Sequence, residues 1–98
     1  MNYKYKLGKE IELTDERNQH ILTFHPELEK HFDKFSEVLL DPDDIRVSPS
    51  DSSVLLFHKS FASIGTGKYL RIAVKINGRW FIVTAYLTKR LVGKVYEY

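Results

Sequence analysis

Apolar and polar residues alternate through the last third of the chain, and an Asn-Gly pair divides this stretch in two. Residues 69–76 and 79–88 are rich in β-branched and aromatic residues, and Asn77 and Gly78 lie between them. Because asparagine and glycine both tolerate a positive φ, the pattern predicts a hairpin with a two-residue turn. We therefore expect two antiparallel strands here.

A two-residue turn also fixes which residues lie opposite one another, and side chains alternate between the two faces of a strand. The expected pairs on one face, almost wholly apolar, are Ile76 with Arg79, Val74 with Phe81, Ile72 with Val83 and Leu70 with Ala85. The expected pairs on the other face are Tyr69 with Tyr86, Arg71 with Thr84, Ala73 with Ile82 and Lys75 with Trp80. This second face carries cations, hydroxyl groups and aromatic rings but no carboxylate, which suits a polyanion with bases that stack.

The first half of the chain predicts a short strand and two helices. Residues 9–13 alternate as a strand would, and they could pair with residues 3–7 across Gly8. Thr14 is a favourable N-cap, so we expect the first helix to run from there to about residue 24. Pro26 suits the first turn of a second helix, in which apolar residues follow helical spacing to residue 40.

The remaining segments predict further strands. Residues 45–47 and 54–59 have strand character, and Gly93 and Lys94 precede a short apolar pair. Two helices followed by strands indicate an α+β fold, with two N-terminal helices packed on one face of an antiparallel sheet of about four strands. The helices should cover the apolar face of the hairpin, and the second face should be open to solvent.

Length and composition narrow the class of protein. Residues 1–98 suffice for a single domain with one modest core. The absence of cysteine excludes disulfides and thiolate metal sites, and it is weakly favourable for a cytoplasmic location. No apolar run approaches the ~20 residues of a membrane span, and we expect no signal peptide.

Charge divides unevenly along the sequence. Residues 1–53 contain 12 acidic and 7 basic residues, whereas residues 54–98 contain 8 basic residues and one acidic residue, Glu97. A half of the sequence in which nearly all charges are positive favours an anionic partner such as nucleic acid. The alternative is that folding mixes the two halves and the potential averages out.

Three stretches together resemble a known family. They are Leu13-Thr14-Asp15-Glu16-Arg17 with His20-Ile21 and His25-Pro26-Glu27, then Asp41-Pro42-Asp43, then Ile72-Ala73-Val74-Lys75 with Val83-Thr84-Ala85-Tyr86. This ordered set resembles the phage-associated branch of the barnase/EndoU/colicin/RelE-like (BECR) nuclease superfamily, over roughly residues 11–86. The resemblance implies a metal-independent, toxin-like ribonuclease without a cofactor, whose active site lies on the open face of the sheet.

Metal-free cleavage of RNA requires a base for the ribose 2′-OH, cations beside the phosphate and an acid for the leaving oxygen. His20 is the first candidate for proton transfer, because histidine titrates near neutrality; a partly buried structural histidine is the alternative. The other expected catalytic residues are Lys75, Thr84 and Tyr86, and the expected substrate-binding residues are Arg71, Tyr69, His58 and Arg17. His58 would share the second face if Leu55 and Phe57 point inward.

Several residues have simpler interpretations. His25 is either a site residue or the joint before Pro26, and His31 is expected on the solvated side of the second helix. Lys59, Lys89 and Arg90 could form a basic margin, that is, further positive charge around the second face. The Gly65-Thr66-Gly67-Lys68 segment is not a phosphate loop, because it lacks the serine or threonine that must follow the lysine in that motif. Asp41, Asp43 and Asp44 are interpreted as a turn that ends the helix rather than as a metal site.

RNA is the expected partner, together with an antitoxin or immunity protein that would neutralise a toxin-like nuclease. We expect the protein to act without binding a membrane and without a metal ion. The rival hypotheses are a non-catalytic RNA- or protein-binding module that uses the same face, and a structural protein that buries this face in a dimer.

Overall fold

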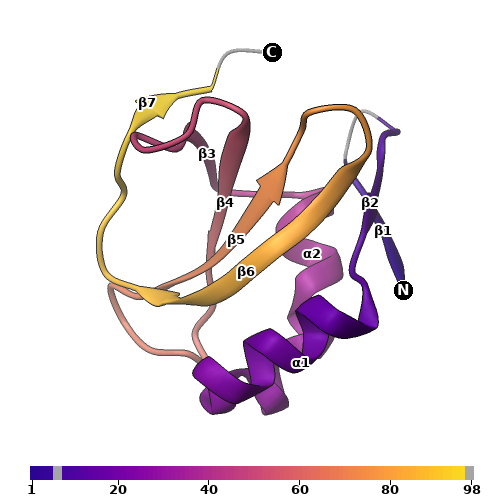
Figure 1. Ribbon diagram of the computed structural model, residues 1–98. Coiled ribbons are helices and arrows are strands. Elements are labelled where there is room, and N and C mark those ends of the chain that lie inside the picture. Colours follow the sequence, from indigo (N-terminus) through magenta and orange to yellow (C-terminus); the bar gives the residue numbers. More distant parts are fainter. Residues whose placement is uncertain (6–7, 97–98) are drawn as a thin grey trace.

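The computed structural model describes residues 1–5 and 8–96, which form one mixed sheet with helices on one side (Figure 1). The elements in chain order are β1 (Asn2–Lys4), β2 (Glu10–Glu12), α1 (Asp15–Phe24), η1 (Pro26–Lys34), α2 (Phe35–Leu40), β3 (Asp44–Val47), β4 (Val54–Ser60), β5 (Tyr69–Lys75), β6 (Trp80–Thr88) and β7 (Lys94–Val95). The predicted α+β class is confirmed. Within the described residues, no helix has the length and apolar character needed to cross a membrane.

The sheet is larger than predicted. It has seven strands in the order β1-β2-β6-β5-β4-β3-β7, where we expected about four. The β2 and β6 strands are parallel, so the sheet is mixed rather than antiparallel. The additional strands β1, β2 and β7 are two or three residues long. The sequence predicted the pair formed by β1 and β2, but it did not show that this pair joins the main sheet beside β6.

The N-terminal elements agree with the sequence pattern. Tyr3 lies opposite Ile11 in the antiparallel pair of β1 and β2, and Lys6 and Leu7 of the expected strand lie outside the described residues. The Thr14 hydroxyl accepts a hydrogen bond from the Arg17 N–H at 3.2 Å and caps α1 as expected.

The second helix begins at Pro26 as predicted, but its first nine residues form the 3₁₀ helix η1 before α2 continues the chain. A 3₁₀ helix has three residues per turn, which places residues three apart above one another. Leu28 and His31 are therefore both buried, and His31 is only 7% exposed. The prediction that His31 lies on the solvated side was wrong for this reason.

The core lies between the helices and one face of the sheet. Ile21 of α1, Leu28 of η1 and Phe35 of α2 are fully buried there. The sheet contributes Leu55 and Phe57 of β4 together with Leu70, Ile72, Val74, Ile82 and Ala85 of the hairpin. Leu70, Ile72, Val74 and Ala85 thus meet the helices as predicted. Ile82 was expected on the second face but lies in the core, because the pairing near the turn is shifted by one residue. His58 points to the face opposite the core because its neighbour Phe57 points inward.

The register of the hairpin differs from the prediction. Gly78 has φ +78°, but no described residue other than glycine has a positive φ, so Asn77 does not form the expected two-residue turn. Lys75 lies opposite Phe81 and Val74 opposite Ile82, one residue later on β6 than expected. None of the expected cross-strand pairs appears in the ladder of β5 and β6.

A bulge between these pairs and the rest of the hairpin adds a second shift. Ala73 lies opposite Thr84 and Arg71 opposite Tyr86, two residues later on β6 than expected, because Val83 has no partner in the ladder. Because side chains alternate with a period of two, a shift of two residues leaves each β6 side chain beyond the bulge on the face where it was expected. Arg71, Thr84 and Tyr86 therefore share the second face even though their individual pairings were wrong.

The second face is covered by the chain itself. We call residues 89–93 the strap, since they connect β6 in the middle of the sheet with β7 at its far edge (Figure 1). The backbone carbonyls of Arg90 and Gly93 accept hydrogen bonds from Arg71 and Arg46 of the sheet. Arg71 is only 6% exposed, so the expectation of an open second face was wrong.

Candidate functional site at the edge of strand β6

Within the described residues, the second half of β6 pairs with no strand at the edge of the sheet that faces β2. The ladder between β2 and β6 contains only Trp80 and Phe81 on the β6 side. Beyond these residues, within the described chain, helix α1 lies along the edge instead of a strand, and Arg17 Nη1 donates a hydrogen bond to the Val83 carbonyl at 3.3 Å. The helix therefore lies next to the residues of β6 that follow the bulge.

His25 reaches the second face around this edge. It ends α1 with a non-helical backbone (φ −136°, ψ 65°), because Pro26 follows it and disfavours helical geometry. Its imidazole ring stacks on the Tyr86 ring with centroids 5.3 Å apart and planes inclined by 26°. The Glu27 carboxylate lies 3.8 Å from His25 Nδ1, and the His25 side chain is 32% exposed. A titratable ring, a phenol and a carboxylate thus meet at a solvent-accessible point.

Arg71 lies beside Tyr86 and makes three hydrogen bonds with its guanidinium group. Its Nη1 donates to the Tyr86 hydroxyl at 3.0 Å, and its Nη2 donates to the Arg90 carbonyl of the strap at 2.6 Å. Its Nε donates to His58 Nε2 at 2.7 Å. The guanidinium also lies 5.3 Å from the centre of the Tyr86 ring. Arg71 therefore fixes the position of Tyr86 and the strap, and it is too buried to bind a phosphate directly.

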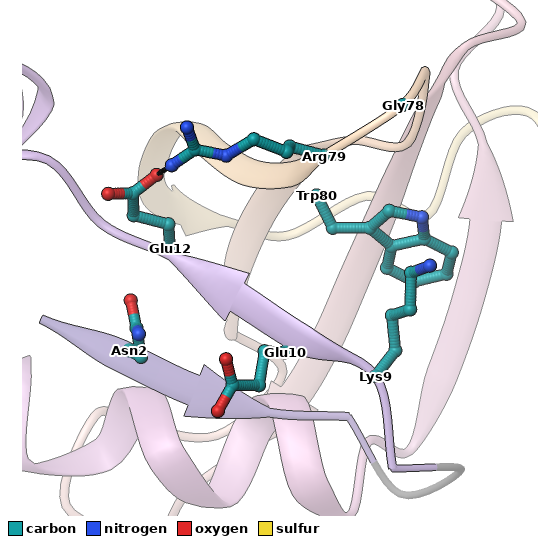
Figure 2. A pocket seen from close by; sticks show the side chains of 7 residues that line it. All are labelled: Asn2, Lys9, Glu10, Glu12, Gly78, Arg79 and Trp80. Carbon is teal, nitrogen blue, oxygen red and sulfur yellow. Dashed lines mark hydrogen bonds and ion pairs between the residues drawn. The ribbon is translucent and has the colours of Figure 1, made fainter.

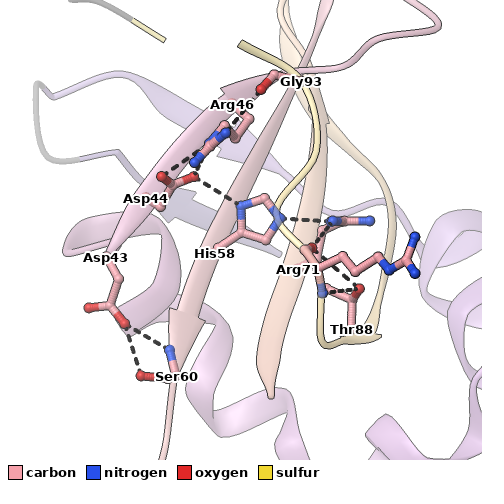
Figure 3. Close-up of polar contacts among 9 residues, drawn as sticks. Asp43, Asp44, Arg46, His58, Ser60, Arg71, Thr88 and Gly93 are labelled. Atoms are coloured by element: carbon pink, nitrogen blue, oxygen red, sulfur yellow. Dashed lines mark hydrogen bonds and ion pairs between the residues drawn. The ribbon is translucent and has the colours of Figure 1, made fainter. Parts of the chain in front are cut away.

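His58 and Asp44 extend this network into the protein (Figure 3). His58 is fully buried, and its Nδ1 lies 3.5 Å from Asp44 Oδ1. Arg46 Nε donates to the same carboxylate at 3.0 Å. Burial and the neighbouring Arg71 guanidinium lower the pKa of His58 to about 4. His58 is therefore neutral at pH 7, with Nε2 free to accept from Arg71 and the Nδ1 proton directed at Asp44.

The expected site residues do not all lie together. Thr84 is half-buried on the same face as Tyr86, two residues before it on β6. Tyr69 lies opposite Thr88, not opposite Tyr86, and its ring is 6.1 Å from the His58 ring. Arg17 also pairs with Glu16 at 3.3 Å.

Two expected catalytic residues lie elsewhere. Lys75 is at the turn end of β5, where its Nζ donates to Asp51 Oδ2 at 2.9 Å. His20 lies on α1 with its ring 4.9 Å from the Phe24 ring, whereas the imidazole that stacks on Tyr86 is that of His25. Of the expected basic margin, Lys59 is held by Asp41 and Asp43 at 3.5 Å each.

Two residues of this region were not predicted as members of the site. Asp44 reaches the second face because β3 pairs with β4, and the register places it opposite His58, so the face does contain a carboxylate. The sequence predicts two consecutive strands here, but nothing in it fixes the register that places Asp44 opposite His58. The sequence favoured His25 as the joint before Pro26 rather than as a site residue. The signal that the sequence offered was the following proline, which disfavours helical geometry at His25 and so ends the helix there.

No family model, curated protein or solved structure matches the chain. Within residues 1–5 and 8–96, no group of three or more histidine, aspartate and glutamate side chains is placed to hold a metal ion.

Proposed function

We propose that the protein is a metal-independent endoribonuclease that acts by attack of a ribose 2′-OH on the adjacent phosphate. The observation that carries the proposal is the His25 imidazole stacked on Tyr86 at an accessible edge, with the Tyr86 hydroxyl held by a buried arginine. The resemblance to the BECR nucleases supports the same reaction. The products would be a 2′,3′-cyclic phosphate and a free 5′-hydroxyl.

His25 and Tyr86 can supply two of the groups that this reaction needs. The Glu27 carboxylate beside His25 Nδ1 favours a proton on that nitrogen, which leaves Nε2 available to take the proton from the 2′-OH. The Tyr86 hydroxyl accepts from Arg71, so its own proton remains available for a phosphate oxygen. Thr84 on the same face of β6 and Arg17, whose guanidinium binds the Val83 carbonyl, are the further candidates for contact with the RNA backbone.

The leaving 5′-oxygen must receive a proton when its bond to phosphorus breaks. The protonated imidazole of His25 can return the proton that it removed, or His20, five residues earlier in the chain, can supply a second proton. We favour His25 for the first transfer because it contacts Tyr86. His20 remains the candidate for the second.

The proposal extends to partners and location. A small ribonuclease would attack the RNA of the cell that makes it, so we include a neutralising antitoxin or immunity protein. The absence of cysteine agrees with a cytoplasmic location.

A second candidate function is an RNA-binding module without catalytic activity. The burial of Arg71 and His58 favours it, because these residues cannot stabilise charge on a bound phosphate directly. In that case the stacked rings of His25 and Tyr86 would serve as a platform for a base.

The experiment that separates the two functions uses purified protein, single-stranded RNA and a metal chelator. We expect wild-type protein to produce fragments that end in a cyclic phosphate, detected by mass spectrometry. His25→Ala and Tyr86→Phe should each cleave about 100-fold more slowly, which is the lower end of the contribution of general acid–base catalysis.

Lys4→Ala serves as the matched control, since Lys4 is exposed on β1 at one edge of the sheet, two strands away from β6. Its cleavage rate should equal that of the wild type. Equal rates for all variants would refute the assignment of the site. RNA that wild-type protein retards on a gel but leaves intact would favour the binding module.

A further inference from the structure

A small hollow lies where β5 begins and β6 ends, beyond Tyr86. Its volume is about 220 Å³, and it is lined by Lys68, Leu87, Thr88 and Lys89. Thr88 lies opposite Tyr69 in the ladder of β5 and β6. The hollow is thus formed by the two ends of the central hairpin that lie farthest from its turn.

The hollow is positively charged and lacks a compensating carboxylate. Lys59 and Lys75 form ion pairs with aspartates, but in the described residues neither Lys68 nor Lys89 has a carboxylate within 4.0 Å. Three other hollows on the described surface each contain glutamate. The one in Figure 2 contains Glu10 and Glu12, and an ion pair joins Glu12 to Arg79 within it. The charge at the end of β6 is therefore free to attract an anion.

The position of the hollow relates it to the candidate site. Thr88 follows Tyr86 by two residues on the same face of β6, a separation of about 6.8 Å along a strand. A polyanion with one phosphate at Tyr86 would bring a neighbouring phosphate to the hollow. Lysine suits such a contact, because its ammonium group is a point charge that does not depend on the orientation of the phosphate.

We propose that Lys68 and Lys89 form a phosphate-binding subsite for single-stranded RNA, next to the pair of rings formed by His25 and Tyr86. The inference rests on the proposed function in that it identifies the ligand as RNA. It deepens that function, because it makes the substrate a strand that extends past the end of β6. Binding at the subsite requires no chemical step, so it can be measured separately from cleavage.

The test uses a 2′-O-methyl RNA octamer, which lacks the attacking hydroxyl and cannot be cleaved. Fluorescence anisotropy gives its dissociation constant at several salt concentrations for wild-type protein and for the double variant Lys68→Ala/Lys89→Ala. Each lost phosphate contact to a single strand lowers the salt slope by about 0.7, so we expect a slope smaller by about 1.4 and roughly tenfold weaker binding at low salt.

The matched control is Lys4→Ala/Lys30→Ala, which removes the same charge from exposed lysines on β1 and η1. Its slope should equal that of the wild type. Equal slopes for the two double variants would overturn the subsite, as would an octamer that does not bind wild-type protein.

Cleavage of unmodified RNA by wild-type protein is measured in parallel. Octamer binding that depends on Lys68 and Lys89, without cleavage, would support the subsite and refute the ribonuclease. Cleavage with unchanged binding by the double variant would support the ribonuclease and refute the subsite.

Discussion

At the scale of single residues, the second face is governed by the need to satisfy buried charge. Arg71 is buried with three acceptors, namely His58, Tyr86 and the Arg90 carbonyl. Removing one partner of a buried charge destabilises a protein strongly, because the charge is then left without compensation. The neutral imidazole of His58 is thus part of the reason that Arg71 can be buried, and its protonation state should affect stability.

We predict that His58 makes the protein less stable in mild acid. Its pKa is lowered from 6.5 to about 4 in the folded state, so between these values the unfolded chain binds more protons than the folded chain. Stability should fall as pH drops from 6.5 to 4, by up to roughly 3 kcal/mol. Urea unfolding at pH 7 and pH 4.5 measures this loss.

His58→Gln should reduce the pH dependence, since the glutamine oxygen can accept from Arg71 and does not titrate. The groups around His58 are Asp44, Arg46, Arg71 and Tyr69. Burial also lowers the pKa of His31, which contributes with the same sign in the same pH range. A pH dependence that is unchanged in His58→Gln but absent in His31→Gln would contradict the assignment to His58.

At the scale of elements, the strap determines how much of the second face is accessible. Arg46 and Arg71 bind its carbonyls near both ends. Gly93 lies where the strap approaches β3, with φ +87°, and a Cβ atom there would collide with the carbonyl oxygen of Val47. The close approach of two backbones therefore requires glycine at this position.

We predict that Gly93→Ala destabilises the protein by at least about 2 kcal/mol, because both the backbone conformation and the contact with β3 are lost. Gly78→Ala is the control, since Gly78 has a similar φ of +78° but no atom within 4 Å of the added Cβ. The control should cost about 1 kcal/mol from the backbone conformation alone. Equal unfolding free energies for the two variants, measured in urea, would show that the strap does not pack against β3 as described.

At the scale of the whole molecule, one hydrophobic cluster connects both ends of the sheet. Tyr3 and Trp80 pack against it near β1, and Tyr96 packs against it beyond β7. Trp80 is the only tryptophan of the chain, and its ring lies 5.6 Å from the Tyr5 ring. Its fluorescence therefore reports on the junction of the N-terminal strands with the hairpin.

We predict a single cooperative unfolding transition, as expected for a domain with one core. Tryptophan fluorescence and far-ultraviolet circular dichroism should give the same midpoint in urea. Trp80→Phe, followed by circular dichroism alone, controls for the contribution of the indole to the dichroism signal. A fluorescence midpoint at lower urea than the dichroism midpoint would mean that β1 and β2 unfold separately from the rest of the sheet.

The sequence by itself determined the features that depend on near neighbours. Thr14 caps the first helix through a hydrogen bond to a residue three positions away, and Pro26 starts the second helix through its own ring. The alternation along β4 put His58 on the face opposite Phe57, although the sequence left open which of the two points inward. These features follow from local hydrogen bonding and from the period of each element, which a single sequence displays.

Only the tertiary structure decided the features that depend on distant segments. The bulge at Val83 sets the final register of the hairpin, and the strap covers a face that its composition suggested would be open. The contact between His25 and Tyr86 joins residues 61 positions apart, and Asp44 reaches His58 only because β3 pairs with β4. Which of many possible long-range contacts form depends on packing of the whole chain, and local pattern carries no information about that choice.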